Sequence, residues 1–124
     1  MADAQILYAS AFGQTITTTG PIYGTGTSIS GASFSANTDY IILAWAYLET
    51  TSTANEAFLR LQQGGVTVTD GEAKYELNSV SPDHKACIGF LRRITQGATP
   101  GTVALDMGTF STNDTTADLF IMAF

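Results

Sequence analysis

The residues best suited to chemistry in this chain are its single histidine and its single cysteine, which lie three positions apart. His84 and Cys87 follow Asp83 in the segment SPDHKAC. A zinc site needs four protein ligands, or three and a water molecule, and the sequence offers no second pair of such residues. In an extended chain, side chains three positions apart also point to opposite faces. We therefore predict a turn that leads into a strand with a small buried thiol, and no metal site.

Nucleophilic catalysis would have to use the same histidine. The segment most similar to a nucleophile elbow, GTSIS at residues 26–30, has serine where the final glycine belongs, and no helix is expected after it. A pair of Cys87 and His84 would need a third, orienting group and an electropositive setting. Neither is visible, so we predict no catalytic residue and a protein that is not an enzyme. The segment YGTGTS lacks the lysine and the strand-to-helix context of a phosphate loop, and we predict no cofactor.

Acidic side chains offer two further candidate sites. Glu72 and Glu76 would share one face of a strand, and such a face is typical of a solvated surface. Asn113, Asp114 and Asp118 are oxygen donors in a predicted loop. Calcium needs six or more oxygen ligands, and Asp and Asn are also ordinary turn residues. The prediction remains that the chain holds no metal.

Two aromatic residues could instead bind a ligand by stacking. Trp45 and Tyr47 lie two positions apart, so on a strand they share a face and could form a platform for a sugar ring. They also lie in a long apolar strand, where aromatic side chains more often bury area in a core. Core packing is the preferred interpretation, and sugar binding is the alternative.

The elements that position these residues are predicted to be strands. Short runs of β-branched and aromatic residues recur between Gly, Asn, Asp, Ser and Pro, and no segment keeps a helical period beyond two turns. The chain is therefore predicted to be all-β, an antiparallel β-sandwich similar to a jelly roll, with eight to ten short strands. We expect strands near residues 5–9, 14–19, 28–34, 39–48, 56–63, 65–69, 72–78, 86–93, 102–107 and 117–123.

One region predicts its own strand pairing. Asp70 and Gly71 are the residue pair favoured by two-residue hairpin turns, and the rungs on either side then match apolar with apolar and polar with polar. A second turn at Gly64 and Gly65 keeps the same pattern. Residues 57–77 are therefore expected to form a three-stranded meander.

Two strands are apolar on both faces. In residues 40–48 and in the terminal segment LFIMAF, neither set of alternate positions is polar. A sandwich of two sheets has only one interior, so something must cover part of an outer surface. The cover could be the N-terminal segment folded back over its own body, or another subunit. We divide the chain into an N-terminal strand or arm at residues 1–33, which packs on its own or a neighbouring subunit, and a sandwich body at residues 34–124.

The composition of the chain argues against two classes of binding partner. The chain of 124 residues has 11 acidic and 5 basic residues and a net charge of −6. Binding to nucleic acid usually depends on positive charge, so we predict no nucleic-acid partner. The longest apolar run, at residues 40–48, is less than half of a membrane-spanning helix, and we predict no membrane contact. The first ten residues have an acid where a signal peptide would be positively charged, so we expect synthesis in a cytoplasm without a signal peptide.

The arrangement of strands and turns over residues 34–124 resembles a known class of protein. It begins with ANTDYIILA at residues 36–44, continues through AFLRLQ and a Gly-Gly turn, then GFLR and GTVAL, and ends in IMAF. This pattern is similar to the small jelly-roll or β-sandwich structural proteins of tailed bacteriophages, which include capsid decoration (cement) proteins and the tips of tail fibres.

The resemblance implies a function and its partners. It implies a virion protein that forms homo-oligomers, often trimers, and that decorates the head by binding the lattice of major capsid protein. The alternative is a tail-fibre or spike tip module that binds a host receptor or glycan. In either case an apolar outer face belongs at an interface with another copy or with the capsid. The predicted interface residues are Trp45, Tyr47, Leu119, Phe120, Ile121, Met122 and Phe124.

Overall fold

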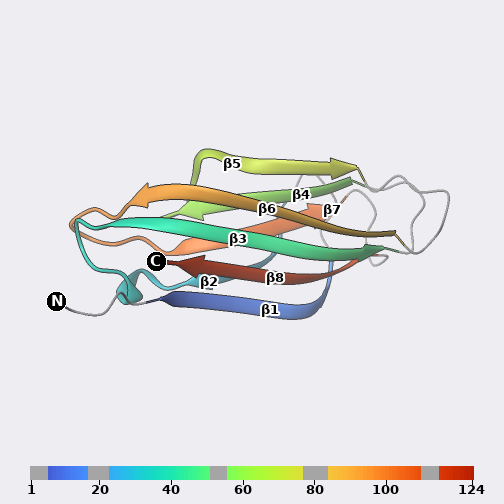
Figure 1. Cartoon of the computed structure of the whole chain (residues 1–124), viewed down its shortest axis with the longest axis horizontal. Coiled ribbons are helices and arrows are strands. Elements are labelled where there is room, and N and C mark those ends of the chain that lie inside the picture. The colour runs from blue at the N-terminus through green and yellow to red at the C-terminus, as the bar shows by residue number, and fades with distance from the viewer. Residues whose placement is uncertain (1–5, 17–22, 51–55, 77–83, 110–114) are drawn as a thin grey trace.

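The protein folds as two antiparallel sheets packed face to face. The computed structural model describes residues 6–16, 23–50, 56–76, 84–109 and 115–124. Within these residues, eight strands run along the length of the molecule (Figure 1). Their bounds are Leu7–Thr15 (β1), Thr25–Ile29 (β2), Asp39–Thr50 (β3), Glu56–Gln63 (β4), Val66–Glu76 (β5), His84–Thr95 (β6), Val103–Thr109 (β7) and Thr115–Ala123 (β8).

The strand order is that of a jelly roll. The first sheet has the order β1-β8-β3-β6 and the second sheet the order β2-β7-β4-β5. The chain crosses between the sheets at every connection except the one from β4 to β5, which pair in the same sheet. Eight strands in two such sheets form the double Greek-key arrangement of a jelly roll. The predicted fold class, an antiparallel all-β sandwich similar to a jelly roll, is confirmed.

The core forms because strands in both sheets alternate between buried and more exposed positions. In β3, Ile42, Ala44, Ala46 and Leu48 are fully buried, and the residues between them face outward. In β8 the buried set includes Leu119 and Ile121, as side chains on a strand alternate between faces. The second sheet supplies the opposing layer, with Ala57, Leu59, Leu61, Val103, Leu105 and Met107 fully buried.

The N-terminal segment contributes one strand to each sheet. β1 pairs with β8 at one edge of the first sheet, and β2 pairs with β7 at one edge of the second. Residues 7–15 therefore lie beside the first sheet in its own plane and not over its outer face (Figure 1). The described parts of the two predicted strands at 5–9 and 14–19 belong to one strand, β1, which is interrupted by a register shift between Ala11 and Gln14; residues 5 and 17–19 lie outside the described residues. Gly13 lies in this shift with a φ of 64°, a conformation that glycine adopts without steric cost.

The predicted hairpin at Asp70 and Gly71 is wrong. β5 continues through both residues and pairs with β4 on either side of a register shift opposite Leu61. Asp70 has a φ of 54°, so the residues form a bulge in one strand and not a turn between two. The turn at Gly64 and Gly65 is present, since Gln63 and Val66 pair across it. Two strands, β4 and β5, therefore replace the expected meander.

A buried glutamine fixes the connection from β6 to β7. The side chain of Gln96 is fully buried, its Oε1 accepts from the Gly101 amide at 2.9 Å, and its Nε2 donates to the Gly101 carbonyl at 3.0 Å. The amide of the Gln63 side chain donates to the same Oε1 at 3.0 Å. The Gln96 side chain thus provides hydrogen-bond partners for both backbone polar groups of a partly buried turn residue.

Candidate functional site: the outer face of the first sheet

The outer face of the first sheet carries rows of apolar side chains that cross all four strands. In one row, Tyr8 of β1 pairs with Met122 of β8, which pairs with Leu43 of β3, which pairs with Leu91 of β6. The two edge residues of this row project into solvent, with 70% of Tyr8 and 61% of Leu91 exposed. The row therefore forms a continuous apolar strip across the sheet.

The next row places two aromatic rings at the centre of the face. Ser10, Phe120, Trp45 and Gly89 are paired in turn across the same strands. The rings of Trp45 and Phe120 are stacked, with centroids 5.4 Å apart and an angle of 25° between their planes. Small residues, Ser10 and Gly89, lie at the two ends of this row, and both rings are partly exposed.

The face continues toward both ends of the strands. Tyr47 pairs with Cys87, and both side chains are exposed. At the other end, the backbones of Phe124 and Ile41 exchange two hydrogen bonds of 2.8 and 3.1 Å, which fix the C-terminal residue to β3. We call this surface the apolar face, and it comprises Ile6, Tyr8, Phe12, Ile41, Leu43, Trp45, Tyr47, Leu91, Phe120, Met122 and Phe124.

Charged residues mark the two ends of the apolar face. At one end, Asp39 accepts hydrogen bonds from the Thr95 hydroxyl at 2.6 Å and from the Arg93 guanidinium. These bonds, that of Thr95 first, hold the pKa of Asp39 below its ordinary value of 3.8. At the other end, Lys85 lies 3.8 Å from Glu49. Each end thus carries one ion pair, and Asp118, which pairs with Tyr47, adds a further carboxylate at the second end.

The outer face of the second sheet has a different character. Its central row runs from Asp106 to Arg60 to Glu72, and Arg60 contacts Asp106 at 3.4 Å. The Arg60 guanidinium also lies 4.2 Å from the centre of the Tyr23 ring. Burial, with a smaller effect from Glu72, raises the pKa of Tyr23 above its ordinary value of 10.0 against the opposing charge of Arg60. Lys74 and Glu56 form another ion pair on this sheet. The two outer faces therefore differ at their centres: the first has apolar side chains there and charges at its ends, and the second has a charged row at its centre.

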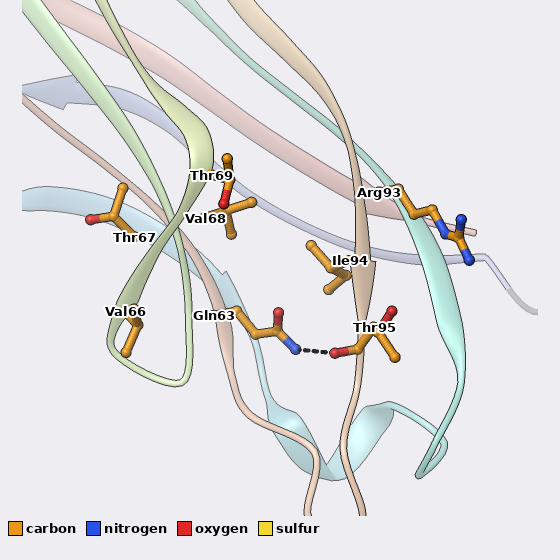
Figure 2. A pocket seen from close by; sticks show the side chains of 8 residues that line it. All are labelled: Gln63, Val66, Thr67, Val68, Thr69, Arg93, Ile94 and Thr95. Carbon is orange, nitrogen blue, oxygen red and sulfur yellow. Dashed lines mark hydrogen bonds between the residues drawn. The ribbon is translucent and has the colours of Figure 1, made fainter.

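A shallow hollow lies along the seam between β5 and β6. It has a volume of about 310 Å³, and Figure 2 shows Val66, Val68 and Ile94 beside it, with Gln63 bonded to the Thr95 carbonyl at 2.9 Å. Its lining holds no aromatic side chain on which a sugar ring could stack.

A side-chain contact also joins the two sheets along the same pair of strands. The Arg92 side chain donates to the carbonyl of Asp70 at 2.9 Å and so joins β6 to the bulge of β5. This bond connects the edge strand of one sheet to the edge strand of the other.

The structure divides the predicted interface residues into two groups. Trp45, Tyr47, Phe120, Met122 and Phe124 lie on the apolar face. Leu119 and Ile121 are fully buried between the sheets, so the prediction of an interface role is corrected for these two. Adjacent residues of a strand cannot share a face, and a list drawn from consecutive residues necessarily included core positions.

Sequence reasoning missed residues at the edges of the face. Tyr8, Phe12 and Leu91 are among its most exposed side chains, yet none was predicted to lie there. The alternation of Tyr8, Ser10 and Phe12 with small residues was visible in the sequence, but it did not reveal that β1 pairs with β8. The preferred interpretation of Trp45 and Tyr47 as core residues was also wrong, because both face outward.

The remaining candidate site residues, for which no catalytic or metal-binding role was predicted, lie in different places. Cys87 is exposed on the apolar face, so the predicted buried thiol is wrong. His84 begins β6 opposite Thr50. Asn113 and Asp114 lie outside the described residues. Among the residues that the structure describes, no group of three His, Cys, Asp or Glu side chains lies close enough to hold a metal ion. No helix in the same residues is long and apolar enough to cross a membrane.

Comparisons with known proteins identify the fold. No family model matches the sequence, and no curated protein matches it. Eiger TNF from S. frugiperda has a similar structure, with a TM-score of 0.53 and 10% identity over 95% of this chain and 90% of that one. Dimeric latent PorU from Porphyromonas gingivalis matches 99% of this chain with a TM-score of 0.52 and 14% identity, and this chain spans 13% of its length. At such low identities the likeness shows a shared β-sandwich fold.

Proposed function

We propose that this protein is a non-enzymatic structural component of a bacteriophage virion, a capsid decoration protein. It oligomerises, as a trimer in the arrangement that its resemblance implies, and it binds the lattice of major capsid protein so that the assembled head is stabilised. Stabilisation follows from mass action, because a protein that binds only the assembled shell shifts the equilibrium toward assembly.

The observation that carries this proposal is the difference between the two outer faces. A face with Tyr8, Leu91, Phe12 and Phe124 about half or more exposed is unusual for a subunit that works alone. Aromatic residues and methionine are enriched at the centres of protein interfaces, and charged residues are depleted there. The apolar face has this composition, and the charged face of the second sheet suits a surface in contact with water. A structural subunit of a shell needs one surface for contact with its neighbours and another for contact with water.

The proposal is tested by the copy number of the protein in purified particles of its source. Quantitative mass spectrometry should find it in numbers comparable to the shell subunit, because a decoration protein occupies repeated lattice positions. A handful of copies per particle would contradict head decoration and favour the tail-tip alternative. Absence from particles would contradict a virion role altogether.

A matched pair of variants connects this result to the apolar face. Phe120→Asp introduces a charge at the centre of the face, and we expect the variant to fold but to be lost from particles. Thr67→Asp introduces the same charge at an exposed position of the second sheet, and we expect normal incorporation. Equal incorporation of both variants would show that the apolar face has no part in attachment.

A further inference from the structure

We propose that the apolar face is covered by another copy of this chain, and that contact with the shell uses other surfaces of the resulting oligomer. This inference rests on the proposed function, which requires both self-association and attachment to a lattice. It assigns the apolar face to the first of these contacts.

The exposed area fits such a contact. The projecting parts of Ile6, Tyr8, Phe12, Leu91 and Phe124, with the partly exposed residues between them, amount to about 700 Å², since a large aromatic side chain accounts for ~150–250 Å² when fully buried. The largest apolar patch of an ordinary monomer is about 300–600 Å². Each partner in a standard protein interface contributes about 800 Å². The apolar face therefore exposes more than a monomer normally does and about what one partner contributes to a stable interface.

The charges around the face also suit a copy of the same chain. Each chain has a net charge of −6, so most contacts between two copies bring like charges together. At the apolar face the described charges are close to balanced, because Arg93 pairs with Asp39 and Lys85 pairs with Glu49. The carboxylate of Asp118, which remains, accepts a hydrogen bond of 2.7 Å from the amide of Gly13. The face thus lacks the excess of one sign that would select an acidic or a basic partner.

The centre of the face holds an aromatic pair of the kind that anchors protein interfaces. The stacked Trp45 and Phe120 rings stand between two small residues, Ser10 and Gly89, in the same row. Central aromatic anchors surrounded by smaller contacts are the usual source of binding energy in protein interfaces.

Sedimentation of the purified full chain across a wide range of concentrations tests the inference. We expect the wild-type protein to have the mass of two or three chains, with dissociation only on strong dilution. Phe120→Asp should have the mass of one chain with an unchanged circular dichroism spectrum, and Thr67→Asp should remain associated. If Phe120→Asp fails to fold, Leu91→Arg replaces it, because Leu91 lies at the exposed edge of the sheet and tolerates a charge without disturbing the core.

Cys87 provides an independent probe of the same surface. It is the one cysteine of the chain and lies on the apolar face beside Tyr47. We expect its reaction with a thiol reagent to be at least tenfold slower in the wild-type oligomer than in Phe120→Asp. Equal rates in an associated wild type would show that the copies meet elsewhere and would overturn the inference.

The two proposals fail in different ways. A wild-type chain that has the mass of one chain at every concentration overturns self-association through this face. The particle copy number can still match that of the shell subunit in that case, and the apolar face would then belong to the shell contact. A self-associating chain that is absent from particles overturns the proposed function and leaves the homotypic contact in place.

Discussion

At the scale of single residues, one step along β8 separates a core residue from a surface residue. Leu119 is fully buried between the sheets, and Phe120 lies on the apolar face against Trp45. The same hydrophobic character therefore stabilises the fold at one position and is available for association at the next. Substitutions at these neighbours separate the two roles.

We expect Leu119→Ala to lower the free energy of unfolding by about 2–5 kcal/mol, because it leaves a cavity in a closed core. Phe120→Ala should cost much less in dilute solution, where association contributes little to stability. Urea unfolding of both variants at low protein concentration checks the difference. A loss at Phe120 as large as that at Leu119 would place Phe120 in the core.

The pKa of Asp39 gives a pH dependence. Hydrogen bonds from Thr95 and Arg93 favour the ionised carboxylate and lower its pKa in the folded protein. Its contribution to stability is therefore present above the ordinary value of 3.8 and is lost as the pH falls below it toward the folded pKa. Asp39→Asn should be less stable than the wild type at neutral pH, and the difference should shrink in acid. A difference that is constant with pH would contradict the effect.

At the scale of residues, prediction from the sequence succeeded where the alternation of side chains along a strand is enough to assign a residue to a face. The opposite orientations of Leu119 and Phe120 follow from the period of a strand. The burial of Cys87 was predicted from the usual preference of cysteine and is wrong, because the pairing of β6 with β3 determines which face it occupies. That pairing joins residues 40 positions apart and has no local signature.

At the scale of elements, β5 shows how a strong local signal can have a second outcome. The pair Asp70 and Gly71 was read as a turn, but here it forms a bulge that presents the Asp70 carbonyl to Arg92 of β6. The turn at Gly64 and Gly65, directly before β5, was predicted correctly. A local sequence pattern cannot decide between bulge and turn when a neighbouring strand, here β4, is long enough to pair on both sides.

The bulge depends on the absence of a side chain at Gly71. A Cβ atom there would lie 2.7 Å from the Val68 carbonyl oxygen and 3.0 Å from that of Leu61. We expect Gly71→Ala to destabilise the protein by about 1–3 kcal/mol, the usual cost of overpacking. Gly97→Ala is the matched control, since nothing lies within 4 Å of its added Cβ. Chemical denaturation of both variants tests this, and equal stabilities would contradict the close contact.

The hydrogen bonds between the Gln96 side chain and Gly101 lead to a similar prediction for the connection from β6 to β7. Gln96→Ala removes the side-chain partners of both backbone groups of the partly buried Gly101, and each hydrogen bond lost costs about 0.5–1.5 kcal/mol. Gln62→Ala removes only a long, exposed bond of 3.4 Å to the Gly65 carbonyl and should change stability little. Thermal unfolding compares the two. A Gln96 variant as stable as the control would mean that water replaces the side chain.

At the scale of the whole molecule, the sequence predicted two sheets and a sandwich with an uncovered apolar surface. It could not locate that surface, because its rows are assembled from β1, β8, β3 and β6, which are distant in the chain. The N-terminal segment was one candidate cover, and residues 7–15 instead extend the sheet at its edge. The side chains of Tyr8 and Phe12 in this strand therefore add to the apolar face and do not cover it.

Self-association predicts that thermal stability depends on concentration. When only the folded chain associates, a higher total concentration favours the folded state. The Tm of the wild type should rise as the protein is concentrated, and the Tm of Phe120→Asp should stay constant. Differential scanning calorimetry over a concentration series measures both. A constant wild-type Tm would count against an association that is coupled to folding.

The contrast between the two outer faces has a consequence for the free subunit. A particle with an apolar side and a charged side is an amphiphile, and it lowers its free energy at any boundary between water and a less polar phase. A dissociated chain should therefore collect at an air–water surface with Trp45 and Phe120 toward the air and the row of Arg60 and Glu72 toward the water. Surface tension would then report the concentration of unassembled subunits.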